Sequence, residues 1–213
     1  MNAFSAFLFR FRGYILGLFA VGVLLCPAYP LFGEAPCVQV LYLCGVLALY
    51  ALGIFLRVKA RMHIGAHSRG RKHDADTLVT SGVYAYMRHP LYCSNSLVIF
   101  GVVLLHLGLA PAALLWILVG SLFELALARI EDRFLESRFG EEWRAWASRT
   151  GVIPSFGSFF GKVAKEKRAL SRRVPPKRTF MQAFCADSST WVWLLIINFL
   201  VVLLKFCEQG KIG

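Results

Sequence analysis

Five long apolar windows constrain this chain more than any other feature. They are residues 14–32, 37–56, 91–109, 112–129 and 190–204. A helix that crosses the hydrocarbon core of a bilayer needs about 20 apolar residues, each adding about 1.5 Å. Only 17% of the 213 residues are charged, whereas soluble domains average about 25%. We therefore expect an all-α, polytopic transmembrane helix bundle of about five spans, folded as a single integral membrane domain over residues 1–213.

The third and fourth windows lie so close together that they predict a tight hairpin. Gly108 and Pro111 fall in the connection, and Pro111 suits the first turn of a helix, where no N–H donor is needed. The two helices then run antiparallel. The start of the third span and the end of the fourth should therefore lie at the same membrane face.

Two basic blocks predict the orientation, because retained cytoplasmic loops collect Lys and Arg. The first is Arg57, Lys59, Arg61, Arg69, Arg71 and Lys72; the second, in the basic loop 161–178, is Lys162, Lys165, Lys167, Arg168, Arg172, Arg173, Lys177 and Arg178. With both blocks in the cytosol, the N-terminus, residues 57–90 and residues 130–188 lie inside. Glu34, the 108–111 hairpin and the C-terminus then lie outside. Lys205 and Lys211 argue against that place for the C-terminus and leave a re-entrant or surface helix open.

The basic blocks favour anionic lipid headgroups over nucleic acid as partners. The formal net charge of the chain is +12, but the blocks lie between apolar spans and carry no interleaved aromatic residues on which bases could stack. Basic segments beside a span attract anionic lipids, although a topology signal alone explains the same pattern. We expect no nucleic-acid partner, and the oligomeric state stays open.

Residues 130–147 have the pattern of an amphipathic helix at the membrane interface. Apolar side chains recur every three to five residues among many charges, at Ile130, Phe134, Phe139, Trp143 and Trp146. One face of such a helix can rest on lipid while the other faces water. Gly140 is the place where we expect this helix to break.

The segment around Pro90 predicts a binding site for an anion. Proline favours the opening turn of a helix, so Arg88 and His89 lie at the mouth of the third span, beside backbone N–H groups and the positive end of the helix dipole. This convergence suits a carboxylate or a phosphate. The alternative is that Arg88 and His89 only anchor the span at the headgroup layer.

A second polar cluster, Arg129 to Asp132, lies at the cytosolic end of the fourth span. The hairpin should bring it next to the mouth of the third span, so that cationic and acidic groups line one cytosolic pocket. Such a pocket suits a zwitterionic amino-acid cofactor, with aromatic faces for a base or a sulfonium. Tyr84, Tyr86 and Tyr92 supply those faces.

The motifs in residues 76–154 resemble a known family. The run LVTSGVYAYMRHPLY is followed by EDRFLESRFGEEW and then by VIP, as in the isoprenylcysteine carboxyl methyltransferases and the related phospholipid methyltransferases. The resemblance implies a methyltransferase that uses S-adenosyl-L-methionine and acts on a lipophilic, membrane-embedded acceptor. That acceptor is a prenylated cysteine carboxylate, a phospholipid amine or a lipid phosphate.

The resemblance also implies the cofactor-binding residues, which are Gly82, Tyr84, His89, Pro90, Tyr92, Glu131 and Asp132. In the family, the histidine and tyrosine of the RHP motif contact the cofactor, a glycine-tyrosine turn precedes them, and an acidic pair lines the pocket. The chain replaces family side chains, without removing a chemical role, at Asp76, Ser94, Asp132, Trp143 and Trp146.

Methyl transfer from a sulfonium is an in-line displacement, which decides what the catalytic residues must do. The protein aligns the nucleophile and the methyl carbon at about 3 to 3.5 Å and excludes water. A carboxylate or phosphate acceptor would be steered by Arg88 or Arg129, whereas an amine would need a proton acceptor such as Glu131. These three residues are the predicted catalytic residues, and both alternatives stay open.

Glu124 lies inside the fourth span, seven residues before Glu131 and therefore on roughly the same helix face. An acid at membrane depth is costly unless it is paired or lines a cavity. We expect Glu124 either to bind substrate in a lipid tunnel or to hydrogen-bond within the bundle. For His106, in the third span, we expect a hydrogen bond between helices.

Metal binding and two other functions complete the alternatives. His63, His67 and His73 have no acidic or cysteine partner at ligand spacing, so we expect no metal. Some NADPH-dependent membrane reductases of the sterol or enone type resemble these methyltransferases in their helical core, and the missing GxGxxG motif does not exclude them. The third alternative is a non-catalytic lipid-binding membrane protein.

Overall fold

A computed structural model describes residues 3–29, 36–64, 77–154, 161–172 and 174–209, and every regular element in these ranges is helical. Five of the helices are long and apolar enough to cross a membrane: α1 (Ala3–Leu24), α2 (Pro36–His63), α3 (Pro90–Leu107), α4 (Pro111–Phe139) and α8 (Ser188–Gln209). The shorter ones are η2 (Gly82–Ala85), α5 (Glu141–Ala147), α6 (Gly161–Arg172) and α7 (Phe180–Cys185). The expected all-α fold with five spans is confirmed, and the chain is an integral, multi-pass membrane protein.

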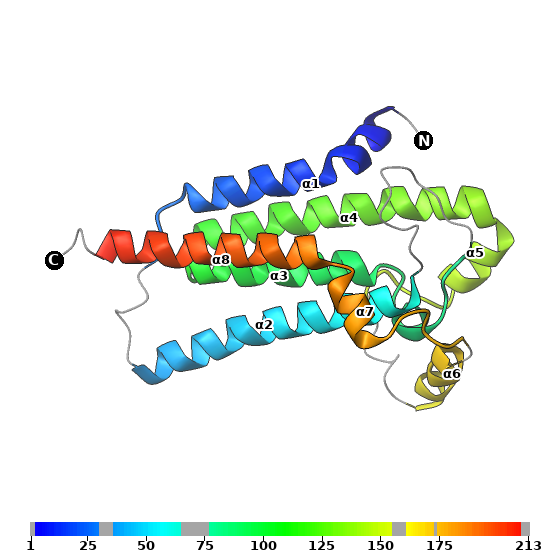
Figure 1. The fold of residues 1–213 in the computed structure, drawn as a ribbon. Helices are drawn as coiled ribbons and strands as arrows, with labels where there is room; N and C mark the ends of the chain where they lie inside the picture. The colour runs from blue at the N-terminus through cyan, green and yellow to red at the C-terminus, as the bar shows by residue number, and fades with distance from the viewer. Residues whose placement is uncertain (1–2, 30–35, 65–76, 155–160, 173, 210–213) are drawn as a thin grey trace.

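The long helices lie side by side around α3, as Figure 1 shows. Helix α3 packs against α2, α4 and α8, while α1 packs mainly against α4. The short elements gather at one end of the bundle, where η2 contacts α6, and α7 contacts α2. The C-terminal end of α8 lies at the opposite end.

Proline and glycine set the bounds of α3 and α4. Each helix begins with a proline in its first turn, Pro90 or Pro111. Each ends at a glycine in the left-handed region, Gly108 with φ 63° and Gly140 with φ 52°, a conformation that a Cβ would strain. The expected break at Gly140 is present, because α5 begins directly after it.

Helix α1 differs most from its predicted window, since it begins at Ala3 rather than at residue 14 and ends at Leu24. Arg10 and Arg12, which precede the predicted window of residues 14–32, lie within the helix. Arg12 donates to the carbonyl oxygen of Phe9, and its guanidinium lies 4.1 Å from the centroid of the Phe9 ring. Aromatic neighbours thus let the helix continue through charged residues. Residues 30–32 of the predicted window lie outside the described residues.

Helices α2, α4 and α8 also extend beyond their windows. Helix α2 continues to His63 because Arg57 and Arg61, expected in a cytosolic loop, both bind Asp187. Helix α4 continues through Glu131 and Asp132 to Phe139. The polar ends of these helices therefore belong to the bundle.

Lys205 and His106 lie at the end of the bundle opposite the short helices. Lys205 is 3% exposed, and its ammonium group donates to the carbonyl oxygens of Tyr29 and His106. His106 Nε2 lies 3.0 Å from the carbonyl oxygen of Cys26, so its expected interhelical hydrogen bond is confirmed. Lys205 is thus accommodated inside the bundle, and the C-terminal end of α8 lies at the end of the bundle away from α5, α6 and α7. The membrane side on which it lies stays a prediction.

The packed interior centres on α3, where Ile99, Val103 and Leu107 meet Val23 of α1 and Ala113 of α4. The opposite face of α4 exposes apolar side chains: Leu114, Leu115, Leu118, Val119 and Leu122. An apolar outer surface of this kind suits lipid. In a bilayer, close packing and polar contacts between helices supply the stability that the hydrophobic effect supplies in water.

Candidate functional site

The mouth of α3 and the far end of α4 meet at an ion-paired cluster. His89, whose side chain is 2% exposed, places Nε2 at 2.8 Å from Asp132 Oδ1. Arg88 donates from Nη2 to the other oxygen of the same carboxylate at 3.1 Å. A cationic helix mouth and an acidic group are thus joined across the two helices, as the sequence predicts.

Arg88 also fixes the segment that follows α5. Its Nη1 donates to the carbonyl oxygens of Ala147, at 3.2 Å, and Thr150, at 2.7 Å. Its backbone N–H donates to the carbonyl oxygen of Gly151 at 2.9 Å. The guanidinium therefore ties the mouth of α3 to the end of α5, and its assignment as a catalytic residue stays a prediction.

Two buried donors in this cluster have no hydrogen-bond partner among the described residues: Nε of Arg88 and Nε1 of Trp143. The Arg88 guanidinium lies 5.8 Å from the centroid of the Trp143 ring, so the two side chains adjoin. Buried donors in native proteins are normally paired. Two such donors at the same place make this cluster the candidate site, because a ligand with acceptor atoms or an ordered water would pair with them.

Turn η2 precedes Arg88 in the chain, contacts α2 and α6, and depends on Gly82. Gly82 has φ 62°, and a Cβ at this position would overlap the imidazole of His63 at the end of α2. Ser81 Oγ lies 3.3 Å from His63 Nδ1. Tyr84 is buried, burial raises the pKa of its hydroxyl well above the ordinary value, and its carbonyl oxygen accepts a hydrogen bond from Trp146 Nε1 at 3.1 Å.

The remaining predicted site residues divide into two groups. Tyr92 contacts His89, with ring centroids 5.6 Å apart, and its hydroxyl lies close to the Glu131 carboxylate. Pro90 opens α3 at this point. Arg129, in contrast, is exposed on α4. The structure therefore gathers the predicted cofactor-binding residues, whereas the roles of Glu131 and Arg129 in catalysis stay predictions.

Glu124 is 2% exposed and belongs to a buried polar network. Both of its carboxylate oxygens lie 3.2 Å from Asn95 Nδ2 of α3. Asn95 Oδ1 accepts from Arg57 at 2.7 Å, and Arg57 Nε donates to Asp187 at 2.8 Å. A hydrogen bond within the bundle was one of the two expectations for Glu124, and this one is observed. Substrate binding by Glu124 stays a prediction.

Sequence reasoning missed the rest of this network. Arg61 donates from Nε to Asp187 at 2.9 Å, so two arginines of α2 share one carboxylate. Asp187 precedes α8 and is 1% exposed. An acid directly before an apolar span was the available signal, because a buried acid needs a partner.

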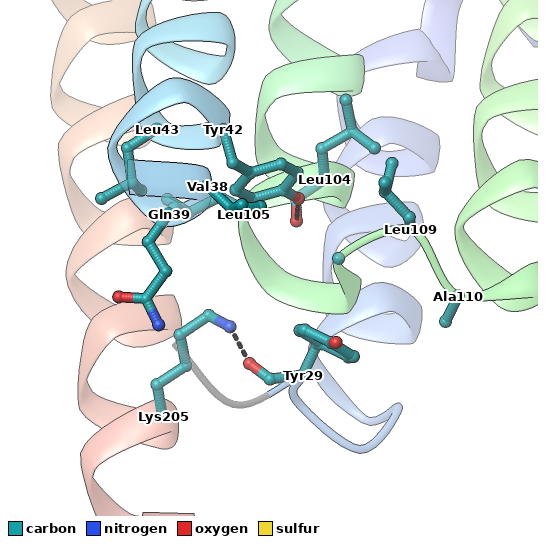
Figure 2. A pocket seen from close by; sticks show the side chains of 11 residues that line it. Tyr29, Val38, Gln39, Tyr42, Leu43, Leu104, Leu105, Leu109, Ala110 and Lys205 are labelled. Carbon is teal, nitrogen blue, oxygen red and sulfur yellow. Dashed lines mark hydrogen bonds between the residues drawn. The ribbon is translucent and has the colours of Figure 1, made fainter. Parts of the chain in front are cut away.

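Two cavities flank the bundle. One of about 440 Å³ lies beside η2, with Thr80, Trp146, Arg149 and Lys167 in its wall. Lys167 is 7% exposed and donates to the carbonyl oxygen of Arg149 at 3.1 Å, and burial lowers the pKa of its ammonium group. The other, of about 290 Å³, lies among α2, α3 and α8 at the far end (Figure 2), where Lys205 reaches its wall.

The described residues contain no group of three or more His, Cys, Asp or Glu side chains that could hold a metal ion. Two of the three histidines considered for zinc, His67 and His73, lie outside the described residues, as does Asp76. His63 instead contacts Gly82. Ser94, another departure from the family pattern, donates to the carbonyl oxygen of Gly53 at 2.8 Å and so joins α3 to α2.

Two curated proteins are similar to parts of the chain. The cobalt-zinc-cadmium resistance protein CzcN of Cupriavidus metallidurans is 40% identical over 105 residues, which are 49% of this chain and 47% of that protein. The protein-S-isoprenylcysteine O-methyltransferase of Schizosaccharomyces pombe is 32% identical over 121 residues, which are 54% of this chain and 48% of that protein. The chain spans about half the length of these relatives. No solved structure matches it.

The sequence model of the phospholipid methyltransferase family covers the part of the chain that builds the cluster. The match runs over residues 40–142 and so includes most of α2 and all of η2, α3 and α4. Helices α6, α7 and α8 lie beyond it. Residues 40–142 of this chain thus match the phospholipid methyltransferase family, which confirms the resemblance predicted from the RHP and acidic motifs.

Proposed function

We propose that this protein is a methyltransferase that uses S-adenosyl-L-methionine and methylates a lipophilic acceptor in the bilayer. One observation carries the proposal: His89 and Asp132 lie 2.8 Å apart where two antiparallel spans meet, beside buried donors of Arg88 and Trp143 that no described residue accepts from. The family match and the S. pombe relative support the same chemistry.

The side chains at the cluster fit an amino-acid cofactor. Arg88 Nε and Trp143 Nε1 are donors and suit a carboxylate. Glu131 is an acceptor for an ammonium group or for ribose hydroxyls, and Tyr92 beside it offers an aromatic face to a sulfonium. Gly82, Tyr84, His89, Pro90 and Asp132 complete the proposed cofactor-binding set. When bound, the cofactor supplies an electrophilic methyl group.

The residues of the chain then act by orientation and by exclusion of water. Asp132 holds the imidazole of His89 through Nε2, and the His89 side chain is 2% exposed, which limits the access of water to it. Arg88, or Arg129 from its exposed position on α4, would steer an anionic acceptor, whereas Glu131 would accept a proton from an amine. Glu124 contributes to acceptor binding on the membrane side.

The proposed orientation places the cluster, the N-terminus and the basic segments in the cytosol. The exposed cations of α6, Lys165, Arg168 and Arg172, lie near η2 at the same end of the bundle. Anionic headgroups are the partners that suit them. The acceptor enters from the bilayer between helices.

Calorimetric titration with S-adenosylhomocysteine tests the proposed function on the purified full chain in detergent. We expect binding by the natural protein, and a loss of about 10- to 100-fold in affinity for His89→Ala, because a hydrogen bond to a charged group is removed. Arg138→Ala, an exposed change on the same extension of α4, is the matched control and should bind normally.

Two outcomes would contradict this function. Binding of NADPH without binding of S-adenosylhomocysteine would favour a reductase. Absence of heat with either ligand, together with full function of His89→Ala, would favour a non-catalytic lipid-binding protein. Methyl-labelled S-adenosylmethionine incubated with native membranes identifies the acceptor from the lipid or protein that becomes labelled.

A further inference from the structure

The cavity of about 440 Å³ that lies among η2, α5 and α6 takes no part in the proposed function. Small-molecule sites usually have volumes of about 300–1,000 Å³, so this cavity has room for a ligand or for part of one. Apolar side chains form part of its wall, and polar side chains of α6 and of the segment after α5 form another part. An occupant must therefore suit both surfaces.

Lys167 is a buried cation of α6 in the wall of this cavity. It is 7% exposed, whereas Lys165, Arg168 and Arg172 of the same helix are exposed to solvent. The inner face of a surface helix normally carries apolar residues. Burial of a charge costs free energy unless hydrogen bonds or an opposite charge compensate for it. The ammonium group of Lys167 therefore needs partners.

The described residues use only part of the bonding capacity of Lys167. An ammonium group has three N–H donors. One of them donates to the carbonyl oxygen of Arg149 at 3.1 Å, and no carboxylate among the residues that the structure describes forms an ion pair with Lys167. Glu142 and Glu166 also line the cavity, but both are exposed, so water and salt screen their charges. Donors of a buried cation are thus left for a ligand or for ordered water.

A phosphate group suits the polar part of the wall. Phosphate is an anion with several acceptor oxygens, and both ammonium and guanidinium groups bind it. Lys167 and the exposed Arg149 supply these two groups, and the hydroxyl groups of Thr80 and Thr150 offer further donors. Burial lowers the pKa of Lys167, and a bound anion would oppose that shift.

The apolar part of the wall favours a phospholipid over a free phosphate ion as the source of this group. A free ion gains nothing from Ala85, Ala145 or Leu170, whereas the glycerol and the first methylene groups of a lipid can be buried against them. Helix α6 lies at the end of the bundle together with α5 and α7 (Figure 1). Its exposed cations suit an anionic membrane surface at the same place.

The segment 147–151, which we call the connector, links this cavity to the proposed cofactor site. Arg88 donates to the carbonyl oxygen of Thr150 at 2.7 Å, and Lys167 donates to that of Arg149. The same short segment is thus bonded to the mouth of α3 and to α6. A change in the position of α6 would therefore act on Arg88, whose buried Nε is a donor of the candidate site.

We propose that the cavity binds the phosphate group of an anionic phospholipid through Lys167 and Arg149, and that this ligand strengthens cofactor binding through the connector. The phosphate neutralises the buried ammonium group, so α6 stays in place and the hydrogen bond from Lys167 keeps the connector against Arg88. Only the effect on the cofactor rests on the proposed methyltransferase function, because the phosphate site does not depend on it.

Short-chain phosphatidic acid tests the site on the purified full chain, in a neutral detergent at about 0.15 M salt, which screens diffuse attraction to exposed charges. Diacylglycerol of the same chain length is the control without phosphate, and inorganic phosphate is the control without chains. Calorimetry should show one saturable site for phosphatidic acid, and this ligand should raise the unfolding temperature. Diacylglycerol should do neither. Inorganic phosphate that binds as tightly as phosphatidic acid would overturn the lipid as the source.

Two matched variants of α6 separate the cavity from the basic surface. Lys167→Met should bind phosphatidic acid about 10- to 100-fold more weakly, because hydrogen bonds to a charged group are lost. It should keep its unfolding temperature without lipid, since an apolar side chain replaces a buried charge, and Lys167→Arg should recover part of the affinity. Arg168→Met removes an exposed cation and should bind normally. Equal losses at both positions, or unfolding of Lys167→Met, would overturn the discrete site.

The effect on the cofactor is read by titration with S-adenosylhomocysteine, with and without saturating phosphatidic acid. We expect the lipid to raise this affinity by about fivefold or more in the natural protein, as coupled sites typically do, and to leave it unchanged in Lys167→Met. An unchanged affinity in the natural protein would overturn the coupling, and a lower one would show that the two ligands compete for a single site.

Two further outcomes separate the phosphate site from the proposed function. A natural protein that does not bind phosphatidic acid would show that water alone pairs with Lys167, and the proposal would fail. A natural protein that binds phosphatidic acid but not S-adenosylhomocysteine would refute the methyltransferase function and leave the phosphate site standing.

Discussion

The two buried polar clusters at the junction of α3 and α4 use their donors differently. In the Arg57 network, all three guanidinium nitrogens of Arg57 have partners. In the His89 cluster, Arg88 Nε and Trp143 Nε1 have none among the described residues. A fully bonded cluster holds helices in place, whereas buried donors without a protein partner are normally paired by a ligand or by ordered water. The first cluster therefore supports the fold around Glu124, and the second is the binding site of the proposed function.

The largest effect that can break this comparison is expected at Asp187. In Asp187→Asn, Arg57 and Arg61 lose their shared carboxylate inside the bundle. Removal of one partner from a buried ion pair costs about 3–5 kcal/mol. Thermal and chemical unfolding in detergent measure this loss, and Asp187→Glu should recover part of it. Unchanged stability in Asp187→Asn would contradict a supporting role for the network.

The lowered pKa of Asp187 predicts that the stability of the fold depends on pH. Burial alone would raise the pKa of the Asp187 carboxyl, but Arg57 and Arg61 outweigh burial and hold that pKa below its ordinary value of 3.8. The folded protein thus favours the ionised form of Asp187. The contribution of this carboxylate to the free energy of unfolding is complete above its ordinary pKa of 3.8, and it is lost as the pH falls through the lower pKa that Asp187 has in the folded protein. Unfolding temperatures measured between about pH 6 and pH 3 should fall more in the natural protein than in Asp187→Asn.

A smaller effect, on binding more than on folding, is expected at Asp132. Asp132→Asn keeps the shape of the side chain but removes the charge that Arg88 and His89 share. We expect affinity for S-adenosylhomocysteine to fall by about 10- to 100-fold, since hydrogen bonds to a charged group are worth about 1.5–3 kcal/mol. Calorimetry beside an unfolding measurement separates the two clusters. A variant that lost stability while keeping its affinity would reverse their assigned roles.

Gly82→Ala should have a smaller effect on the same cluster. The residue has φ 62°, and an added Cβ would overlap the His63 ring. Left-handed backbone costs a residue with a Cβ about 1–2 kcal/mol, which corresponds to about tenfold in affinity for S-adenosylhomocysteine. His63→Ala/Gly82→Ala should recover part of the loss, because it removes the overlap and leaves only the backbone cost. No recovery would show that contact with His63 does not limit the turn.

The two clusters also differ in how far the sequence predicts them. Apolar windows and prolines at helix starts are local signals, and they predict the five spans. The short hairpin between α3 and α4 then predicts that His89 and Asp132 lie near each other. The partner of Arg57, in contrast, is Asp187, 130 residues away along the chain. Asn95 is an ordinary amide within an apolar helix, and no local pattern marks it as the link to Glu124. Contacts of this kind depend on which helices pack against each other, and local sequence patterns do not predict that.

The smallest effect is expected at Arg144, where ion pairs lie in water. Arg144 donates to Glu136 at 2.9 Å and to Glu141 at 2.6 Å, but its side chain is 57% exposed. Solvent and salt screen such pairs, and ordering two long side chains offsets what attraction remains. Arg144→Ala should therefore change neither the unfolding temperature nor the affinity for S-adenosylhomocysteine within error, at low or at high salt. A clear loss at low salt that disappears at high salt would mean that α5, which carries Trp143 and Trp146, is held in place by surface charge. The hydrogen bonds from Arg88 to Ala147 and Thr150 would then not be what fixes α5 against α3.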